Sequence, residues 1–272
     1  MKKAALRILF FSLIIVTGLG LGCCKKPDNK SNNNGTLVLK FHITGGGQPF
    51  ALNHAILNTT GQRYYFTVLA FYASNVTLTG NDSQLLSSIL LIDTYPSDII
   101  NNPAQVDTTF TFNNVTPGTY TGLKFGIGPD AQQNQQGGGS YAYTNYPSNS
   151  PLGDYYAQSG NQFYWGTSLG YLFFLAQGDY DPSANNTGSI NQQFAYHCGT
   201  DSDFSTKTFT SPIQITAGAT TTFTINLETN DIFNAPNVIN LKKSNDESTH
   251  TTDNPLLAKE LLQNLNAALK TN

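Results

Sequence analysis

Alternation of apolar and polar side chains is the feature that most restricts what this chain can fold into. From Thr36 onward, Leu37, Leu39, Phe41 and Ile43 alternate with polar residues, which is the period of a strand with one buried face. Turn-like sequences then separate further strand-like runs, which lie at 64–78, 90–94, 110–112, 120–127, 169–176, 192–197, 206–210 and 220–227. The pattern predicts an all-β fold, an immunoglobulin-like sandwich of antiparallel strands.

The period changes at the C-terminus. Asn254 is a good helix cap and Pro255 suits the first helical position. Leucines follow at every fourth position, at 257, 261, 265 and 269. We therefore expect an amphipathic helix over 254–270 that lays its leucine stripe on the sheet.

The first residues predict export. Lys2, Lys3 and Arg7 precede an apolar run at 8–16, which is too short to cross a bilayer core of about 30 Å as a helix. Small residues follow up to Cys23 and Cys24, which look like a bacterial lipoprotein cleavage site where either cysteine can become the lipidated residue. We expect a signal peptide over 1–24 and a protein held in the bacterial cell envelope by lipid, on the outer membrane or on the periplasmic face.

Composition indicates how the rest is organised. Residues 25–35 are polar and rich in Asn, so we expect a disordered tether, and 36–272 then form one domain. The net charge of −3 argues against nucleic acid as a partner, because phosphate binding needs clustered Lys and Arg. Beyond the leader Cys198 is the sole cysteine, so no disulfide framework is expected.

Several of the residues suited to metal binding or proton chemistry gather in the segment 163–199. It contains Trp165, which is the only tryptophan, and His197, one of four histidines, directly before Cys198. Imidazole and thiolate suit copper, which exported proteins encounter. Neighbours on a strand point to opposite faces, so His197 and Cys198 cannot share a site without a bulge. His197 is therefore the candidate ligand, and Cys198 is expected to be a small buried residue.

Three stretches together resemble the family of MbnP-like copper-binding proteins, which are associated with methanobactin uptake. The first is the strand region 64–78, which contains a match to the pattern F-Y-x-S-N-x-x-L. The second is the turn and strand at 117–128. The third joins Trp165 and the Gly170-Tyr171 pair to His197-x-Gly199, which resemble the signatures W-x-W-x-x-G-Y and H-x-G. The resemblance covers nearly all of the chain beyond the tether.

The resemblance implies one copper ion bound through histidines and, in some members, a tryptophan oxidised to kynurenine at the metal. His197 matches the H-x-G histidine and Trp165 the first tryptophan, and Tyr171 would help to shape the pocket. Thr167 stands at the second tryptophan position, so a modification that belongs there is absent. For the second ligand the candidates, in order of preference, are His54, His250 and His42. A di-haem peroxidase-like partner is implied by the resemblance alone.

We therefore predict an exported, membrane-anchored copper-binding protein without catalysis of its own. The letters G-x-S-x-G occur at 166–170, but a strand-like run follows them and not the helix that a nucleophile elbow needs, and nothing marks a pair of catalytic carboxylates. The alternative is a metal-free surface lipoprotein that binds glycans or another nutrient through Trp165 and the tyrosine-rich loop 141–156.

A second pattern typical of a metal site lies at 179–185, inside the segment 163–199. Asp179-x-Asp181-x-Ser183-x-Asn185 resembles the beginning of a calcium loop. Ala184 stands where such loops have glycine, and Ile190 where they have the closing glutamate. We interpret the stretch as a polar hairpin loop.

Overall fold

The structure, a computed structural model, describes residues 34–94, 108–135, 142–153, 163–166 and 169–272. The expected signal peptide with Cys23 and Cys24, nearly all of the expected tether, and Thr167 lie outside the described residues. The first strand already begins at Gly35, the last residue of the expected tether.

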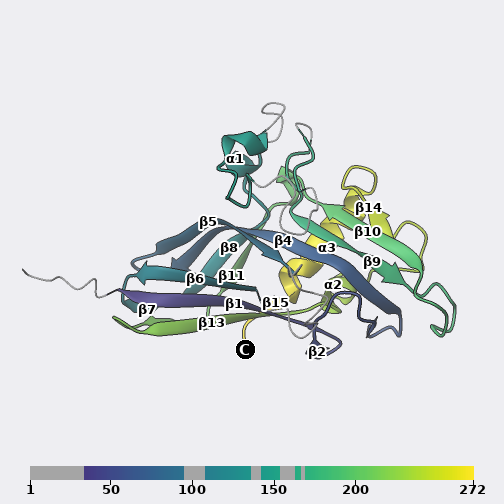
Figure 1. The fold of residues 1–272 in the computed structure, drawn as a ribbon, viewed down its shortest axis with the longest axis horizontal. Coiled ribbons are helices and arrows are strands. Elements are labelled where there is room, and N and C mark those ends of the chain that lie inside the picture. The colour runs from purple at the N-terminus through teal and green to yellow at the C-terminus, as the bar shows by residue number, and fades with distance from the viewer. Residues whose placement is uncertain (1–33, 95–107, 136–141, 154–162, 167–168) are drawn as a thin grey trace, which may run out of the picture. The chain divides into compact units, whose positions relative to one another are not determined.

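Strands dominate the described residues and form two main sheets and a small ribbon (Figure 1). The larger sheet follows the order β11-β8-β4-β9-β10-β14, with β3 and β5 also paired to β4. Its strands are β3 (Ile56–Leu57), β4 (Arg63–Thr79), β5 (Gln84–Asp93), β8 (Gly122–Ile127), β9 (Phe174–Tyr180), β10 (Gln192–Cys198), β11 (Ser205–Phe209) and β14 (Ser248–Thr249).

The smaller sheet follows the order β15-β13-β1-β2, with β6 also paired to β1. Its strands are β1 (Gly35–Gly45), β2 (Gln48–Pro49), β6 (Thr108–Val115), β13 (Thr220–Glu228) and β15 (Leu269–Lys270). The ribbon pairs β7 (Gly118–Tyr120) with β12 (Ile213–Ile215). The helical elements are α1 (Ala131–Asn134), η1 (Ala142–Asn145), η2 (Asp201–Asp203), α2 (Asp231–Asn234) and α3 (Pro255–Ala268).

The main core lies between the two sheets. The predicted inward face of β1 is fully buried, and its Phe41 ring packs edge-on against Phe71 of β4 at 5.9 Å between ring centroids. Phe125 of β8 lies 6.1 Å from the same ring. These contacts join the sheets through large apolar surfaces, which dominate folding energetics. The prediction of an all-β sandwich is confirmed.

Strand direction departs from the prediction in two places. β1 pairs in parallel with β13, with Leu39 opposite Phe223, and β10 pairs in parallel with β14. The turn residues of an antiparallel hairpin predict its strand pairing from the local sequence. A parallel pair is joined by a long connection, so no local sequence pattern predicts its pairing. The alternating pattern therefore indicated the strands but not these two pairings.

The terminal helix α3 forms where its sequence signals place it. The Asn254 side chain accepts a hydrogen bond from the backbone N–H of Leu257, and Pro255 occupies the first turn. Leu257, Leu261 and Leu265 are buried against the core. Leu269 is the exception, because it belongs to β15, where it pairs with Leu227 of β13 instead of extending the helix.

A second apolar cluster covers the outer face of the larger sheet. In Figure 1, α1 stands on the side of this sheet away from β1 and β13. The expected strand at 169–176 begins only at Phe174, because the preceding residues return from a tight hairpin. In that hairpin the N–H of Trp165 donates to the carbonyl of Gly170 at 2.7 Å, and the N–H of Leu172 donates to the carbonyl of Phe163 at 2.8 Å. The hairpin places Trp165 at the edge of this outer cluster.

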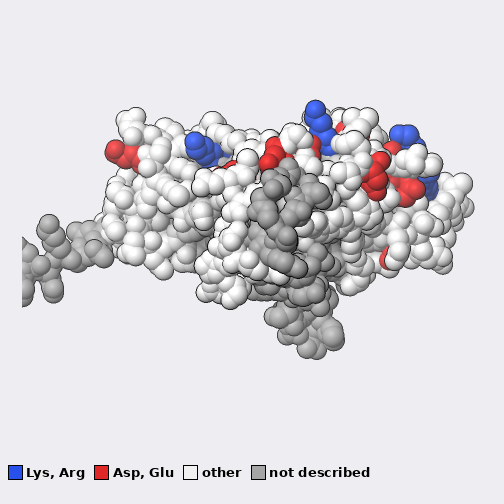
Figure 2. All heavy atoms as spheres, turned by 90° about the horizontal axis from the view of Figure 1, so that it is seen from above, with Lys and Arg blue, Asp and Glu red and all other residues white. Residues whose placement is uncertain are grey.

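Charged side chains are thinly spread over the described residues. On the face seen in Figure 2, Lys and Arg, like Asp and Glu, form only small spots among uncharged atoms, some of them side by side. Within the described part of the chain, no helix has the length and apolar character needed to cross a membrane.

Candidate metal centre

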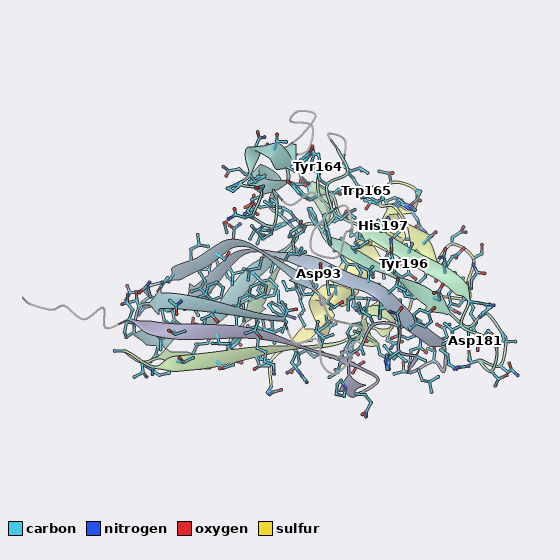
Figure 3. The ribbon with its side chains drawn as sticks, in the orientation of Figure 1. Asp93, Tyr164, Trp165, Asp181, Tyr196 and His197 are labelled. Atoms are coloured by element: carbon cyan, nitrogen blue, oxygen red, sulfur yellow. The ribbon has the colours of Figure 1, made fainter. Side chains whose placement is uncertain are left out.

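Three aromatic rings from distant parts of the sequence meet on the outer side of the larger sheet. The ring centroids of His197 and His250 are 4.8 Å apart and the rings are nearly perpendicular, at 83°. The Trp165 ring stacks on His250 at 5.5 Å and meets His197 edge-on at 4.9 Å. Figure 3 shows Trp165 beside His197, well away from Asp181 at the far end of the sheet. The described residues thus bring two imidazoles together against the only indole in the chain.

Strand β10 determines which way His197 points. His197 lies opposite Leu175 of β9, on the face that carries the outer cluster, whereas Cys198 belongs to the core between the sheets. Burial raises the pKa of the Cys198 thiol well above its usual value. The prediction that these neighbours face opposite sides, with Cys198 buried, is confirmed.

His250 reaches His197 because β14 runs beside β10. Thr249 pairs with Tyr196 in a parallel bridge, so the next residue of each strand is His250 and His197. The Thr251 hydroxyl then donates to the carbonyl of His197 at 2.8 Å and accepts from the N–H of Gly199 at 3.0 Å. These bonds attach the turn after β14 to the end of β10.

Gly199 explains the H-x-G spacing in physical terms. Its φ of +142° lies in the region that favours glycine, and a Cβ there would come within 2.5 Å of the backbone nitrogen of Phe173. Any other residue would push the end of β10 away from the segment before β9. The glycine therefore allows the close approach that supports His197.

Asp253 orients the second imidazole. Its carboxylate accepts a 2.7 Å hydrogen bond from the backbone N–H of His250 and lies 3.1 Å from Nδ1 of the same residue. Burial raises the pKa of the Asp253 carboxyl, but the hydrogen bonds from His250 outweigh burial and hold that pKa below its usual value. A carboxylate on Nδ1 leaves Nε2 of His250 as the nitrogen available to a metal. Asp253 is not among the residues predicted from the sequence, although its spacing of three residues from His250 is a usable signal.

His197 offers an unsatisfied nitrogen. Its Nε2 lies 2.6 Å from Nε2 of Gln177, whereas its Nδ1 is buried and has no hydrogen-bond partner among the described residues. Burial, followed by repulsion from His250 and partly offset by Asp253, lowers the pKa of His197 from 6.5 to about 4. The imidazole is therefore neutral at neutral pH, which is the form that binds metals.

These residues fit a small two-histidine site. The described residues hold no group of three or more His, Cys, Asp or Glu side chains suited to a metal ion. The imidazole pair therefore stands without a carboxylate or thiolate ligand, and imidazole is a ligand type suited to copper. The buried Nδ1 of His197 is the observation that favours a cation here, because an unsatisfied buried polar atom is costly.

The other predicted residues lie elsewhere or act differently. His54 is exposed and lines a cavity of about 270 Å³ beside β1 and β2, and His42 lies on β1 opposite Asn226. Tyr171 is buried, and its ring contacts are with Tyr72, Tyr146 and Tyr164, so it supports the hairpin that carries Trp165. The order of preference among second histidines thus changes, because His250, not His54, lies against His197.

The tyrosines of the described residues do not form a flat platform. The rings of Tyr143 and Tyr164, and those of Tyr164 and Tyr171, are each inclined at 57°. A sugar-stacking surface needs exposed rings in one plane, and Tyr164 and Tyr171 are buried. The remainder of the tyrosine-rich loop, 154–156 included, lies outside the described residues.

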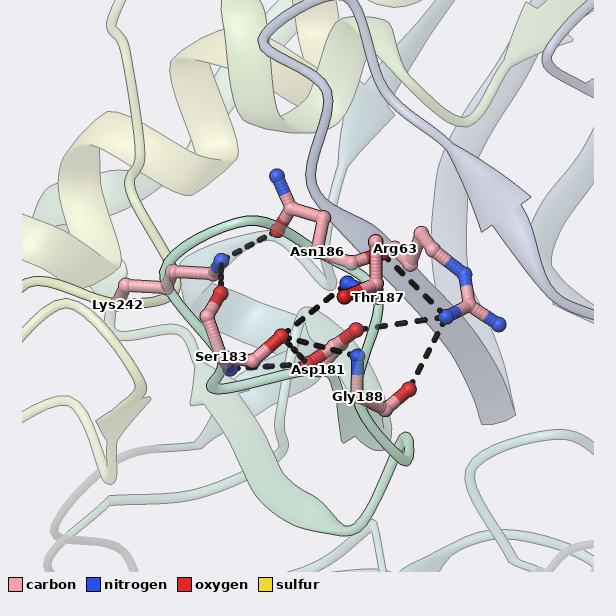
Figure 4. A network of polar contacts seen from close by, with 7 residues as sticks. All are labelled: Arg63, Asp181, Ser183, Asn186, Thr187, Gly188 and Lys242. Atoms are coloured by element: carbon pink, nitrogen blue, oxygen red, sulfur yellow. Dashed lines mark hydrogen bonds and ion pairs between the residues drawn. The ribbon is translucent and has the colours of Figure 1, made fainter.

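The calcium-like loop between β9 and β10 is held by its own side chains together with Arg63 of β4 and Lys242 (Figure 4). Asp181 is buried, accepts from the backbone and hydroxyl of Ser183 at 2.9 and 2.6 Å, and pairs with Arg63 at 3.4 Å. The Lys242 ammonium donates to the Ser183 carbonyl and to the Asn186 amide. Arg63 and Ser183 thus already engage the carboxylate of Asp181, the second residue of the calcium-like pattern, in agreement with a polar hairpin loop.

Comparison with known proteins adds to this geometry. No curated protein matches the chain. Among solved structures, MbnP from Methylosinus trichosporium is similar, with a TM-score of 0.53 and 13% sequence identity over 79% of this chain and 83% of that one. At that identity the likeness shows the fold alone.

The sequence model of the MbnP family matches residues 34–252, from the first strand to the turn that follows His250. This match spans more than half of the sequence and confirms the resemblance seen in its motifs: the chain belongs to the MbnP family.

Proposed function

We propose that this protein binds one copper ion in the cell envelope and performs no catalysis of its own. His197 and His250 hold the ion, and Trp165 covers it. The observation that carries the proposal is the buried Nδ1 of His197, which has no hydrogen-bond partner among the described residues and belongs to a ring 4.8 Å from that of His250. A bound cation satisfies that nitrogen.

The chemistry of the site supports copper over harder ions. Both ligands are imidazoles, and the described residues offer no thiolate or carboxylate as a third ligand, because the Asp253 carboxylate is engaged by His250. Magnesium and calcium prefer oxygen ligands, whereas imidazole suits copper. The Trp165 ring stacks on His250 and meets His197 edge-on, which limits how far either ligand can move.

The cellular setting rests on the leader and the family. The basic start, the short apolar run and the Cys23-Cys24 pair support export and lipid attachment to the envelope. Membership of the MbnP family supports a role connected with copper and methanobactin. By the same resemblance, Trp165 is a candidate for oxidation by a di-haem peroxidase-like partner.

Copper titration of the mature protein tests the proposal. Cu(I) affinity is measured by competition with a chromophoric chelator for the wild type, His197→Ala, His250→Ala and His54→Ala. We expect one copper per chain in the wild type, loss of tight binding in the first two variants, and no change in the third, because His54 is exposed and lies beside β1 and β2.

Two results would contradict the proposal. One is a folded wild-type protein that takes up no copper. The other is loss of binding in His54→Ala together with retention in His250→Ala. Peptide mass mapping of the protein isolated from its own cells shows whether Trp165 carries the mass change of conversion to kynurenine.

A further inference from the structure

Gln177 is the side chain that holds His197 from within the sheet. It lies on β9 opposite Ala195, while His197 lies opposite Leu175, so the two are diagonal neighbours on one face of an antiparallel pair. A long side chain spans that diagonal, and Nε2 of Gln177 lies 2.6 Å from Nε2 of His197. Both residues belong to central strands, β9 between β4 and β10, so the contact has a rigid base.

The contact links the orientation of an amide to the position of one proton. A neutral imidazole carries hydrogen on one nitrogen only, and a glutamine amide offers donors on one side and an acceptor on the other. If the amide nitrogen donates to Nε2 of His197, the ring hydrogen is on Nδ1, which is buried and has no acceptor among the described residues. An orphaned buried donor costs about 1–3 kcal/mol.

Rotation of the Gln177 side-chain amide by half a turn reverses the direction of its hydrogen bond with His197. The Gln177 oxygen then accepts a hydrogen bond from Nε2–H of His197, and Nδ1 carries a lone pair in place of the hydrogen. Amide nitrogen and oxygen are nearly equal in size, so the turn needs no other movement. A cation on that lone pair satisfies both ring nitrogens at once.

We propose that Gln177 is a positioning residue that holds His197 through Nε2 and so makes Nδ1 the nitrogen that binds the cation. This inference rests on the proposed function and deepens it. His250 is held the other way round, because Asp253 contacts its Nδ1 at 3.1 Å and leaves Nε2 outward. The two imidazoles therefore present different nitrogens, Nδ1 of His197 and Nε2 of His250.

Nitrogen-15 spectra test the assignment directly. Long-range proton–nitrogen spectra of the labelled mature protein report which ring nitrogen carries hydrogen, and Cu(I) is diamagnetic, so the loaded protein is measured in the same way. His197 is assigned by its absence in His197→Ala. We expect Nε2 of His197 to be protonated in the Cu(I) form and the coordination shift to appear at Nδ1.

Variants separate positioning from simple packing. Gln177→Leu removes the hydrogen bond, so we expect a mixture of His197 tautomers without metal and a Cu(I) affinity about 10–100-fold weaker, as for other residues that orient ligands. Gln177→Glu keeps an oxygen acceptor, so it is expected to retain the Nε2–H tautomer and the affinity. Gln193→Leu is the matched control, because Gln193 is an exposed glutamine on β10.

The outcomes for Gln177 and for copper binding can be told apart. Coordination at Nε2 of His197, or a Gln177→Leu variant with unchanged tautomer and affinity, overturns the inference. If the wild type takes up no Cu(I), the proposed function fails. The role of Gln177 is then decided without metal. A His197 tautomer that differs between wild type and Gln177→Leu supports it, and the same tautomer in both proteins overturns it.

Discussion

The Thr251 hydroxyl donates a 2.8 Å hydrogen bond to the backbone carbonyl of His197 and accepts one from the N–H of Gly199. Thr251 itself has a φ of +63°, an unfavourable conformation for a β-branched residue. Such strain persists only where the surroundings hold it, and it is common at functional sites. Here one strained residue ties the turn that carries His250 to the strand that carries His197.

Replacing Thr251 by valine should loosen this connection. Thr251→Val keeps the shape but leaves a carbonyl and an N–H without their partner, at a cost of about 1–3 kcal/mol for each buried group. We expect a lower free energy of unfolding, measured with denaturant, and weaker copper binding. Thr251→Ser keeps the hydroxyl and serves as the control. Equal stability of the valine and serine variants would contradict this account.

The pKa of His197 predicts a loss of stability in mild acid. Burial lowers this pKa to about 4 in the folded protein from 6.5, so the unfolded chain binds more protons between these values. Stability is therefore fully present above about pH 6.5 and falls as the pH falls towards 4, by up to about 3 kcal/mol.

Denaturant unfolding between pH 4 and pH 7 checks this, with His197→Gln as the comparison. The wild type should lose stability relative to the variant as the medium becomes acidic. Parallel pH profiles for the two proteins would show that His197 is not the group responsible.

Gly170 should tolerate no side chain in the hairpin that carries Trp165. It has a φ of +72°, and a Cβ there would lie 2.2 Å from the Asn134 side-chain oxygen. Gly166 has a similar φ of +87°, but a Cβ there would have no atom of the described residues within 4 Å. Gly166→Ala therefore meets only backbone strain, about 1–2 kcal/mol, whereas Gly170→Ala adds a clash with a buried residue.

Thermal melts and the fluorescence of Trp165 provide the measurement. We expect a clearly lower Tm and altered emission for Gly170→Ala and a small change for Gly166→Ala. A Gly170→Ala protein as stable as Gly166→Ala would mean that Asn134 moves aside without cost.

The loop between β9 and β10 should depend on Arg63 and not on calcium. Arg63→Gln removes the cation beside Asp181 and its 3.0 Å bond to the Gly188 carbonyl. Because the Arg63 side chain is 38% exposed, we expect a modest fall in Tm of about 2–4 °C. Lys243→Gln, at an exposed pair with Asp246, is the control and should change little.

Calcium or a chelator should leave the Tm of the wild-type protein unchanged, because Ser183 and Arg63 already engage the Asp181 carboxylate. A rise in Tm with added calcium would contradict this interpretation and indicate that the loop binds calcium.

Local features of the chain were predictable because they depend on neighbours in sequence. The alternation along β1 placed Leu37 and Phe41 inside and His42 outside, and Asn254 with Pro255 announced the start of α3. The same reasoning separated His197 from Cys198, since adjacent strand residues face opposite ways. The sequence shows that residue 199 is a glycine of the H-x-G motif. It does not show the close approach of Phe173, which is the reason that a glycine is required there.

The sequence by itself determined the strands, the terminal helix and His197 as the leading candidate ligand. Tertiary structure alone decided which histidine joins His197. His54 and His250 both stand in loop-like sequence, and the parallel pairing of β10 with β14 brings His250 to the site. That pairing, like those of Gln177 and Asp253 with the imidazoles, depends on how the sheets assemble. Hydrogen bonds between distant strands leave no mark in local spacing, so only the folded chain reveals the site as a whole.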